Sequence, residues 1–484
     1  MLVRLSKNSF VRIIDNGAYG YIFNQLSFHD RCYLHAGVDM LSVLSRNAQD
    51  QDQLANEIIS LYPSADPAKV CADFTEMMNS LAKAKFIVQG NTIQELDEKD
   101  TEFSYRLENP KTLIEDYSQM TEEVVFENTE AFQLRHDSNK PRLSSIQFEL
   151  TGKCNERCIH CYIPNPKKDN GKTMSLELVK NIIDQFEALG GLHVTLSGGE
   201  ALLHPRIKDI LRYCRYKDLQ ISLLSNLINL TDDLVKVLKE VNMSIVQTSL
   251  YSMEHEIHDY ITTIPGSWEK TMEAIKKLHA ADVPVQISCP VMKANAKGYK
   301  NVMKFAKSLK MKSQTDYIMM AQSDQNTQNL ANRISLDETE NLIHDIVNQD
   351  SDYQRLLEEV KPESSLPLLE RSEMPVCGVG LNQICVAANG DFFPCAGWQE
   401  MIVGNISENS LKEIWFNSPQ LNNLRKIKRK DFPKCFNCEA GDYCVMCMAR
   451  NYNESGDIFM PPTHTCEVAS LNKRIAEERL NIKK

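Results

Sequence analysis

The middle of the chain, residues 144 to 320, alternates between short apolar segments and amphipathic helical segments, and this alternation constrains the fold most strongly. A strand followed by a helix and a second strand predicts a parallel sheet, because parallel pairing needs a crossover connection. The predicted strands cover residues 146–150, 193–197, 220–224, 244–250, 283–289 and 313–320. These six repeats predict an α/β fold, a partial (β/α)6 barrel like an incomplete TIM barrel, with its chemistry at the carboxyl ends of the strands.

Three cysteines follow the first predicted strand directly. The segment Thr151–Tyr162 places Cys154, Cys158 and Cys161 in a C-x3-C-x2-C spacing. Three thiolates on one short loop can bind three irons of a [4Fe–4S] cubane and leave the fourth iron without a protein ligand. A zinc site is the rival interpretation, but it usually needs a fourth protein ligand, which would be His160 or a distant residue.

The second predicted strand is followed by Gly198, Gly199 and Glu200. Because this motif lies one β/α unit after the cysteine loop, the sequence closely resembles the radical S-adenosylmethionine (SAM) superfamily. The resemblance implies that SAM chelates the open iron through its amine and carboxylate, and that Glu200 accepts a hydrogen bond from the ammonium group. The glycines would let the backbone approach the ligand.

Two serines at strand ends are further candidates for contacts with SAM. Ser225 closes the third predicted strand and Ser249 closes the fourth. The resemblance implies that Ser249 binds the methionine carboxylate or the ribose, but a hydroxyl at a strand end is as often a simple cap. Related enzymes often read Ser-Leu-Asp-Gly at this point, and Tyr251 replaces that Asp.

A second group of cysteines fills the C-terminal region: Cys377, Cys385, Cys395, Cys435, Cys438, Cys444, Cys447 and Cys466. Their spacing resembles the SPASM domain, which holds two auxiliary [4Fe–4S] clusters, although two residues separate the last close pair where the family usually has three. The resemblance implies one ligand set of Cys377, Cys395 and Cys447, and a second of Cys435, Cys438, Cys444 and Cys466. Cys385 could complete the first set or be a buried core residue of a strand. A zinc ribbon is disfavoured because its cysteine pairs usually stand about 15 to 20 residues apart.

Residues 1–90 form a separate predicted α+β unit. β-forming residues on both sides of Asn16-Gly17 predict a hairpin of residues 9–15 and 19–25, followed by three helices and a last strand at 86–89. This order resembles the winged-helix peptide-recognition domain attached to many enzymes that modify ribosomally made peptides. The resemblance implies that a leader peptide adds as a strand to a sheet edge. A structural or nucleic-acid-binding winged helix is the alternative.

Charge and composition indicate the limits of the remaining domains. We expect an acidic linker at residues 91–143, a radical SAM domain at 144–350, a connection at 352–375 and a SPASM domain at 376–484.

The net charge of −11 argues against a nucleic-acid partner. Without a signal peptide or a membrane-spanning apolar run, we expect no membrane anchor and a cytoplasmic location, where thiols stay reduced. The four other cysteines are expected in cores: Cys32, Cys71, Cys214 and Cys289.

The order of recognition unit, radical SAM domain and SPASM domain resembles maturases of ribosomally synthesised and post-translationally modified peptides. The resemblance implies three [4Fe–4S] clusters, SAM, a precursor peptide with a leader, and a one-electron reductant such as flavodoxin or ferredoxin. It also implies that a 5′-deoxyadenosyl radical removes a carbon-bound hydrogen and that a cysteine thioether cross-link results. The alternatives are carbon–carbon or carbon–oxygen cross-linking, formylglycine-type oxidation of a protein Ser or Cys, and an electron-transfer or leader-binding protein without catalysis.

Overall fold

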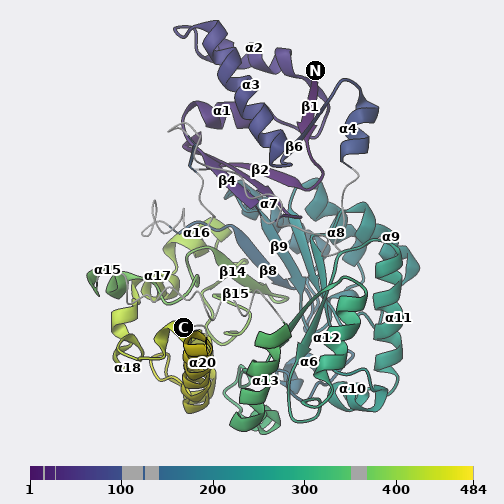
Figure 1. Cartoon of the computed structure of the whole chain (residues 1–484), viewed down its shortest axis with the longest axis vertical. Coiled ribbons are helices and arrows are strands. Elements are labelled where there is room, and N and C mark those ends of the chain that lie inside the picture. Colours follow the sequence, from purple (N-terminus) through teal and green to yellow (C-terminus); the bar gives the residue numbers. More distant parts are fainter. Residues whose placement is uncertain are drawn as a thin grey trace.

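The computed structural model describes residues 1–14, 17–27, 29–100, 124–125, 141–169, 171–349 and 368–482. Most of the predicted acidic linker and of the connection at 352–375 therefore lies outside the described residues. Figure 1 shows an N-terminal unit at the top, a parallel sheet with helices beside it in the middle, and the C-terminal cysteine region at the lower left.

The N-terminal unit combines two small sheets with four helices. One sheet has the order β5-β1-β6 and the other the order β2-β3-β4-β7. Their strands are β1 (Leu2–Leu5), β2 (Ser9–Ile14), β3 (Tyr19–Asn24), β4 (His29–Tyr33), β5 (Gln49–Asp50), β6 (Ile87–Gly90) and β7 (Val124–Val125). The helices are α1 (Ala36–Ser42), α2 (Gln51–Leu61), α3 (Pro67–Lys83) and α4 (Ile93–Lys99).

The predicted hairpin is confirmed, since β2 and β3 pair antiparallel with Ile14 opposite Tyr19. Gly17 supplies a positive φ of 90° in the turn between them. The sequence did not predict β1, β4 or α4, which are short or carry few apolar residues. Helix α4 packs on β1 and β6 through the buried Leu96, so this unit continues to Asp100.

The predicted parallel sheet is present, and its strands keep their chain order. The strands are β8 (Ser145–Glu149), β9 (His193–Ser197), β10 (Gln220–Leu224), β11 (Ile245–Ser249), β12 (Val285–Pro290) and β13 (Lys312–Asp316). The last strand ends four residues before its predicted end. The helices between them are α7 (Leu176–Ala188), α8 (Ile207–Tyr216), α9 (Asp232–Glu240), α10 (His255–Thr262), α11 (Ser267–Ala280) and α12 (Tyr299–Ser308).

The sheet continues beyond β8 into the C-terminal region, which the sequence did not predict. Strand β14 (Gln383–Ala387) pairs parallel with β8, and β15 (Asp391–Phe393) and β16 (Gly404–Asn405) follow antiparallel to give nine strands. This pairing satisfies the backbone groups on the edge of β8 that would otherwise stay open. It also brings the C-terminal cysteine region directly against the strand that leads into the cysteine loop.

Helices complete the C-terminal region and pack it against the rest of the molecule. They are α13 (Leu336–Gln349), α15 (Leu368–Glu373), α16 (Leu411–Asn417), α17 (Pro419–Lys426), α18 (Pro433–Phe436), α19 (Met448–Ser455) and α20 (Thr463–Ile482). The amide of Leu411 in α16 donates to Gln185 Oε1 of α7 over 2.7 Å, and α13 packs beside α20 (Figure 1). In the part of the chain that the structure describes, no helix is both long and apolar enough to cross a lipid bilayer.

The N-terminal unit docks on the loops that precede β9, β10 and β11, and we call this contact the seam. Arg12 Nε donates to Gly191 O over 2.9 Å, and Asn242 Nδ2 donates to Lys7 O over 2.8 Å. Phe10 and Phe23 of the hairpin form a small buried apolar cluster with Leu192. The N-terminal unit therefore lies at the amino ends of the parallel strands, whereas the cysteine loop follows the carboxyl end of β8.

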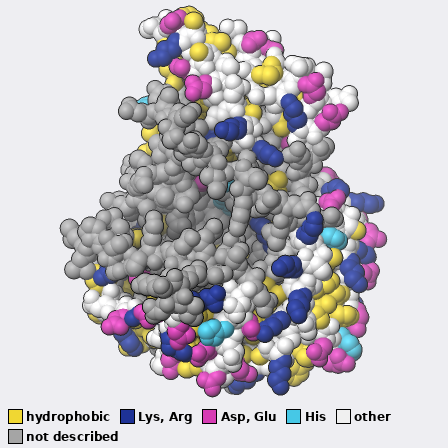
Figure 2. Space-filling model, in the orientation of Figure 1, with side chains coloured by type: hydrophobic (Ala, Val, Ile, Leu, Met, Phe, Trp, Pro, Cys, Tyr) yellow, Lys and Arg dark blue, Asp and Glu magenta, His cyan; other side chains and the backbone are white. Residues whose placement is uncertain are grey.

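The outer surface of the parallel-sheet helices is polar and mixed in charge. Figure 2 shows Lys and Arg side chains interspersed with Asp and Glu at the lower right, where α8, α9 and α11 lie. Several of these charges form ion pairs, such as Arg212 with Glu240 at 2.8 Å and Lys277 with Asp232 at 3.0 Å. Exposed pairs of this kind add little to stability.

The seam predicts a pH dependence of stability. His193 packs edge-on against Phe23 with ring centroids 5.1 Å apart, and burial, together with the charge of Arg12, lowers its pKa from 6.5 to about 4. As the pH falls, His193 takes up a proton near pH 6.5 in the unfolded chain but only near pH 4 in the folded protein. The stability that neutral His193 contributes is therefore complete above pH 6.5 and is lost as the pH falls towards 4. We expect wild-type protein to lose up to about 3 kcal/mol more than His193→Gln across this window.

Thermal unfolding between pH 7.5 and 4 measures this difference, and His255→Gln, on an exposed helical residue, is the matched control. Parallel pH profiles for wild type and His193→Gln would contradict the assignment.

Candidate functional site

The cysteine loop runs from the end of β8 to α6 (Asn165–Asp169), and close backbone packing holds its first residues. Gly152 N donates to Lys172 O over 2.9 Å, and the hydroxyls of Thr151 and Thr173 lie 2.9 Å apart. A Cβ on Gly152 would lie 2.6 Å from the Cα of Gly171. The first residues of the loop, before its cysteines, are therefore held against residues 171–173.

The Gly198-Gly199-Glu200 turn packs directly on the same loop. Gly199 N donates to Thr151 O over 2.7 Å, and Glu200 N donates to Lys153 O over 2.9 Å. A Cβ on Gly198 or Gly199 would lie 2.5 or 2.4 Å from the carbonyl oxygens of Thr151 and Lys153, respectively. Gly198 also has a φ of 140°. The glycines are thus required by contact between two backbone segments, a reason that the sequence interpretation, which considered only the ligand, did not contain.

The Glu200 carboxylate is buried and held by three protein donors. It accepts from Leu202 N at 2.8 Å, from Ser225 Oγ at 2.7 Å and from Asn226 N at 2.8 Å. Burial raises the pKa of Glu200, and the hydrogen bonds from Ser225 and Asn226 oppose that rise. Ser225, predicted as a contact to SAM, therefore supports Glu200 through its hydroxyl.

An unsatisfied amide lies beside this carboxylate. Asn226 Nδ2 donates to Asn155 Oδ1 over 2.7 Å, which ties the end of β10 to the cysteine loop. Asn155 Nδ2 is buried and has no acceptor among the described residues. A buried donor without an acceptor is costly, so a polar ligand that brings an acceptor here would satisfy it. The chemistry of this corner fits the polar end of SAM.

Tyr251, which stands where the resemblance implies an Asp, contacts the cysteine loop. Its hydroxyl donates towards Cys158 Sγ over 3.8 Å and accepts a hydrogen bond from Ser249. The ring is buried and packs against His160 and His258, with centroids 5.2 and 5.3 Å apart, respectively. Ser249 therefore orients a tyrosine that stands next to one of the three loop thiols.

Two charged residues in the site were missed from the sequence. Glu156 is buried and accepts from Cys158 Sγ over 3.2 Å, and burial raises its pKa to about 7. Lys168 in α6 is only 3% exposed, and its charge opposes the rise in the pKa of Cys154, which burial takes to about 11. Neither residue lies on a periodic pattern, so no sequence signal distinguished it from other loop charges.

The C-terminal cysteines fall into two neighbourhoods. Burial raises the pKa of Cys395 to about 12, and the charges of Cys447 and Cys377 add to this rise. Burial likewise raises the pKa of Cys444 to about 11, and the added charges come from Cys435, Cys466 and Cys438. The charges that act on these two cysteines come from within the two sets that the SPASM resemblance implies, and ligation of a cluster by either set stays a prediction.

Cys385 lies in the middle of β14, opposite Gln147 of β8, and is 5% exposed. Burial raises the pKa of Cys385 well above the ordinary value, and the charges of Glu149 and Cys395 raise it further. The residue is therefore both a core strand residue and a neighbour of the first set, so both sequence interpretations stay open.

Tyr162 joins the two cysteine regions. Burial raises its pKa well above the ordinary value, and the charges of Glu149, Cys161, Cys385 and Cys395 contribute. These residues come from the cysteine loop, β8 and the C-terminal region, so the first C-terminal set lies next to the loop. All fifteen cysteines are free of disulfides, and thiol-rich sets of this kind suit iron–sulfur centres. Of the cysteines expected in cores, Cys32, Cys214 and Cys289 are buried and Cys71 is half-buried.

Comparison with known proteins adds independent findings. The Radical SAM superfamily model matches residues 148–306, and the SPASM iron–sulfur cluster-binding domain model matches residues 377–439. The AdoMet-dependent heme synthase of Methanosarcina barkeri (strain Fusaro / DSM 804) is 26% identical over 66% of this chain and 95% of its own length. The antilisterial bacteriocin subtilosin biosynthesis protein AlbA of Bacillus subtilis (strain 168) is 27% identical over 64% of this chain and 68% of its own length.

Among solved structures, Streptococcus suis SuiB bound to its precursor peptide SuiA superimposes with a TM-score of 0.62 and 13% identity. The match covers 96% of this chain and 99% of SuiB, and it shows a common fold. The chain thus combines a radical SAM domain with a C-terminal SPASM domain. These domains support a radical SAM enzyme and imply iron–sulfur clusters and SAM as cofactors.

The packing of the glycine turn predicts the effect of a single methyl group. We expect Gly199→Ala to lower the free energy of unfolding by about 1–3 kcal/mol, because the added Cβ would overlap Lys153 O and push the cysteine loop away. The iron content should fall with it. Thermal unfolding and iron analysis of anaerobically purified protein measure both effects.

The matched control is Gly298→Ala, whose added Cβ would meet its nearest neighbour at 3.6 Å. It should cost less than about 1 kcal/mol and retain the iron. Equal behaviour of the two variants would refute the packing argument.

Proposed function

We propose that this radical SAM protein is a maturase that modifies a ribosomally made precursor peptide and forms a cysteine thioether cross-link. The observation that carries the proposal is the N-terminal α+β unit, docked at the seam and joined to the two cofactor-binding domains. The fold likeness to SuiB, which extends over 96% of the chain, supports the same three-part arrangement. Similarity to AlbA, whose name describes bacteriocin biosynthesis, supports a peptide substrate.

We assign the radical-generating cluster to Cys154, Cys158 and Cys161, and the auxiliary clusters to the two C-terminal sets. Glu200, Asn155 and Asn226 would hold the polar end of SAM, and Gly198 and Gly199 would shape the turn beside it. When bound, these groups supply a 5′-deoxyadenosyl radical and an electron acceptor. The thiol-rich neighbourhoods and the unsatisfied Asn155 amide support this assignment.

The chain's own residues control the environment of that chemistry. Tyr251 directs its hydroxyl towards Cys158 Sγ, so it would donate a hydrogen bond to a sulfur ligand and favour the reduced state of the cluster. Lys168 and Glu156 are both less than 5% exposed, and the charge of Lys168 opposes the burial-driven rise in the pKa of Glu156 beside the loop. Burial of these groups excludes water from the place where a radical would form.

The outer edge of β4 is the proposed site for the leader. In the described residues, the short strand β7 pairs antiparallel there with Cys32 and Tyr33, so we expect the leader to extend this sheet beside β4 beyond those two residues or to replace β7. The seam holds this unit at the amino ends of the parallel strands, so a peptide must run at least one strand length to reach the cysteine loop. A strand of five residues spans about 17 Å, so we expect at least five residues between the leader contact and the modified residue.

The thioether is the product that we propose, and its electron balance fits the cofactor set. A bond between a cysteine sulfur and a carbon forms when the thiol hydrogen and one carbon-bound hydrogen are removed, which is a two-electron oxidation. Carbon–carbon or carbon–oxygen cross-linking and formylglycine formation need the same domains and remain the alternatives. Haem synthesis is a second candidate, favoured by 26% identity over almost the full length of the Methanosarcina barkeri heme synthase.

The cluster assignment predicts iron content and activity. Anaerobic reconstitution should give about twelve irons per chain, four for each of three cubanes. Replacing Cys154, Cys158 and Cys161 together by Ala should remove about four irons and abolish 5′-deoxyadenosine formation, while the auxiliary clusters stay visible by electron paramagnetic resonance. Cys214→Ala, at a buried helical cysteine far from these sets in sequence, is the control and should keep all irons. A total near four irons, or SAM cleavage by the triple variant, would refute the assignment.

The proposed product predicts a change in mass and in thiol count. We expect a cysteine-containing precursor to lose two hydrogens and one alkylatable thiol in each event, measured by mass spectrometry after alkylation. The core peptide without its leader is the control and should stay unmodified. Two hydrogens lost with every thiol still reactive would indicate a carbon–carbon or carbon–oxygen bond, and a hydrazide-reactive carbonyl would indicate formylglycine. Turnover of an iron porphyrin with no change in any peptide would favour haem synthesis.

A further inference from the structure

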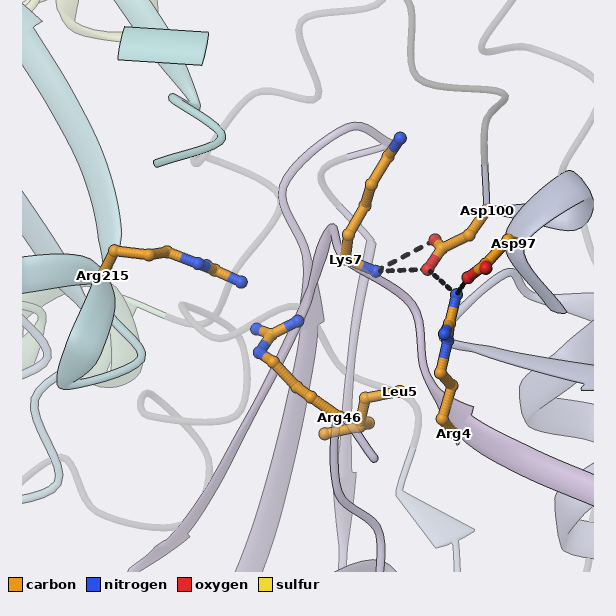
Figure 3. Close-up of a pocket in the computed structure, with 7 residues that line it drawn as sticks. All are labelled: Arg4, Leu5, Lys7, Arg46, Asp97, Asp100 and Arg215. Carbon is orange, nitrogen blue, oxygen red and sulfur yellow. Dashed lines mark hydrogen bonds and ion pairs between the residues drawn. The ribbon is translucent and has the colours of Figure 1, made fainter. Parts of the chain in front are cut away.

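A cavity of about 350 Å³ opens at the seam (Figure 3). No cysteine of the predicted ligand sets lines it. Its charged lining comes from both sides of the seam: Arg4, Lys7, Arg46, Asp97 and Asp100 from the N-terminal unit, and Arg215 from α8. Four of these side chains are cationic and two are anionic. The function proposed above gives this cavity no role.

The two carboxylates in the cavity are already engaged on one side. Arg4 Nη2 lies 2.7 Å from Asp97 Oδ1 and 3.3 Å from Asp100 Oδ2. Asp100 also accepts from the backbone amide of Lys7 at 3.0 Å. These contacts, drawn as dashed lines in Figure 3, fasten α4 to β1. Arg46 and Arg215 line the opposite side of the cavity.

On that opposite side two guanidinium groups share one carboxylate. Asp218, just beyond α8, lies 2.6 Å from Arg46 Nη2 and 3.8 Å from Arg215 Nη1. Arg46 also donates to the backbone oxygens of Ser6 and Ser9, at 3.0 and 2.7 Å, respectively. Arg215 is less well satisfied, since its buried Nη1 has no hydrogen-bond acceptor within the described ranges.

The two guanidiniums are held in place by the same aromatic ring. The Cζ atoms of Arg46 and Arg215 lie 5.1 and 5.2 Å from the centroid of the buried Phe10. Figure 3 shows the Arg215 side chain reaching across the cavity towards Arg46. Two like charges are therefore fixed close together at a partly buried position.

The electrostatics of this corner are unbalanced. Burial lowers the pKa of Arg215 to about 10, and the charge of Arg46 lowers it further while Asp218 opposes the shift. A partly buried arginine without enough counter-charge is unfavourable, and an oxyanion that accepts two hydrogen bonds from a guanidinium is its best partner.

We propose that the seam cavity binds an oxyanion between Arg46 and Arg215, and that the bound anion strengthens docking of the N-terminal unit on the parallel-sheet domain. The ligand group is a carboxylate or a tetrahedral oxyanion, carried either by an acidic peptide side chain or by a small free anion. The proposal rests on the cavity and its arginines and does not depend on the peptide-maturase function.

The test titrates the full-length, reconstituted protein with sodium sulfate against sodium chloride at equal ionic strength, using calorimetry and the thermal midpoint. We expect sulfate to bind wild type and Arg215→Gln to bind it at least tenfold more weakly. The matched control is Arg212→Gln on the same helix, since Arg212 is exposed, pairs with Glu240 and does not line the cavity. Arg215→Lys keeps the positive charge but loses the paired N–H donors of the guanidinium, so its sulfate affinity should be intermediate. This variant keeps the test decisive if Arg215→Gln is poorly folded.

A second arm identifies the source of the anion. An acetylated tetraglutamate amide that competes with sulfate, when its tetraglutamine counterpart does not, would assign the site to peptide carboxylates. Sulfate binding without such competition would assign it to a small free anion. Equal sulfate affinity in wild type, Arg215→Lys and Arg215→Gln, or no binding to wild type, would overturn the proposal.

Discussion

The contact between the glycine turn after β9 and the loop after β8 is the interaction on which the rest of the site depends. The backbones of Gly198 and Gly199 lie against the carbonyl oxygens of Thr151 and Lys153, so close that one methyl group would overlap them. This contact fixes the first part of the cysteine loop and, through Glu200, Ser225 and Asn226, joins the carboxyl ends of three neighbouring strands. A loop of polar residues thereby becomes a rigid site without a large apolar core of its own.

Continuity of the sheet extends this rigidity to the C-terminal region. Because β14 pairs with β8 over five residue pairs, Cys385 and the first C-terminal cysteine set lie beside the strand that carries the cysteine loop. Tyr162 and Glu149 lie in the space where these regions meet. Auxiliary clusters held there would be near the cluster proposed for the cysteine loop, which is the arrangement that the proposed oxidation of a peptide needs.

The two ends of the parallel strands have different tasks in this arrangement. The carboxyl ends hold the cysteine loop and its supporting network, and the amino ends hold the N-terminal unit through Arg12, Asn242 and the Phe10–Phe23 cluster. The N-terminal unit and the cysteine loop are thus separated by the length of the sheet. An anion at the seam would act on the position of the N-terminal unit without touching the cysteine loop.

The sequence alone determined the parallel sheet, the cysteine loop and the glycine turn, because strand alternation and motif spacing are local patterns. Its strand limits agree with the structure to within two residues, except at the end of β13. Tertiary structure alone decided the pairing of β8 with β14, which joins residues more than 230 positions apart. It also decided the contact of Tyr251 with Cys158, the burial of Glu156 and Lys168, and the docking of the hairpin on the loops before β9 to β11. These features depend on contacts between distant segments, which no local period or spacing encodes.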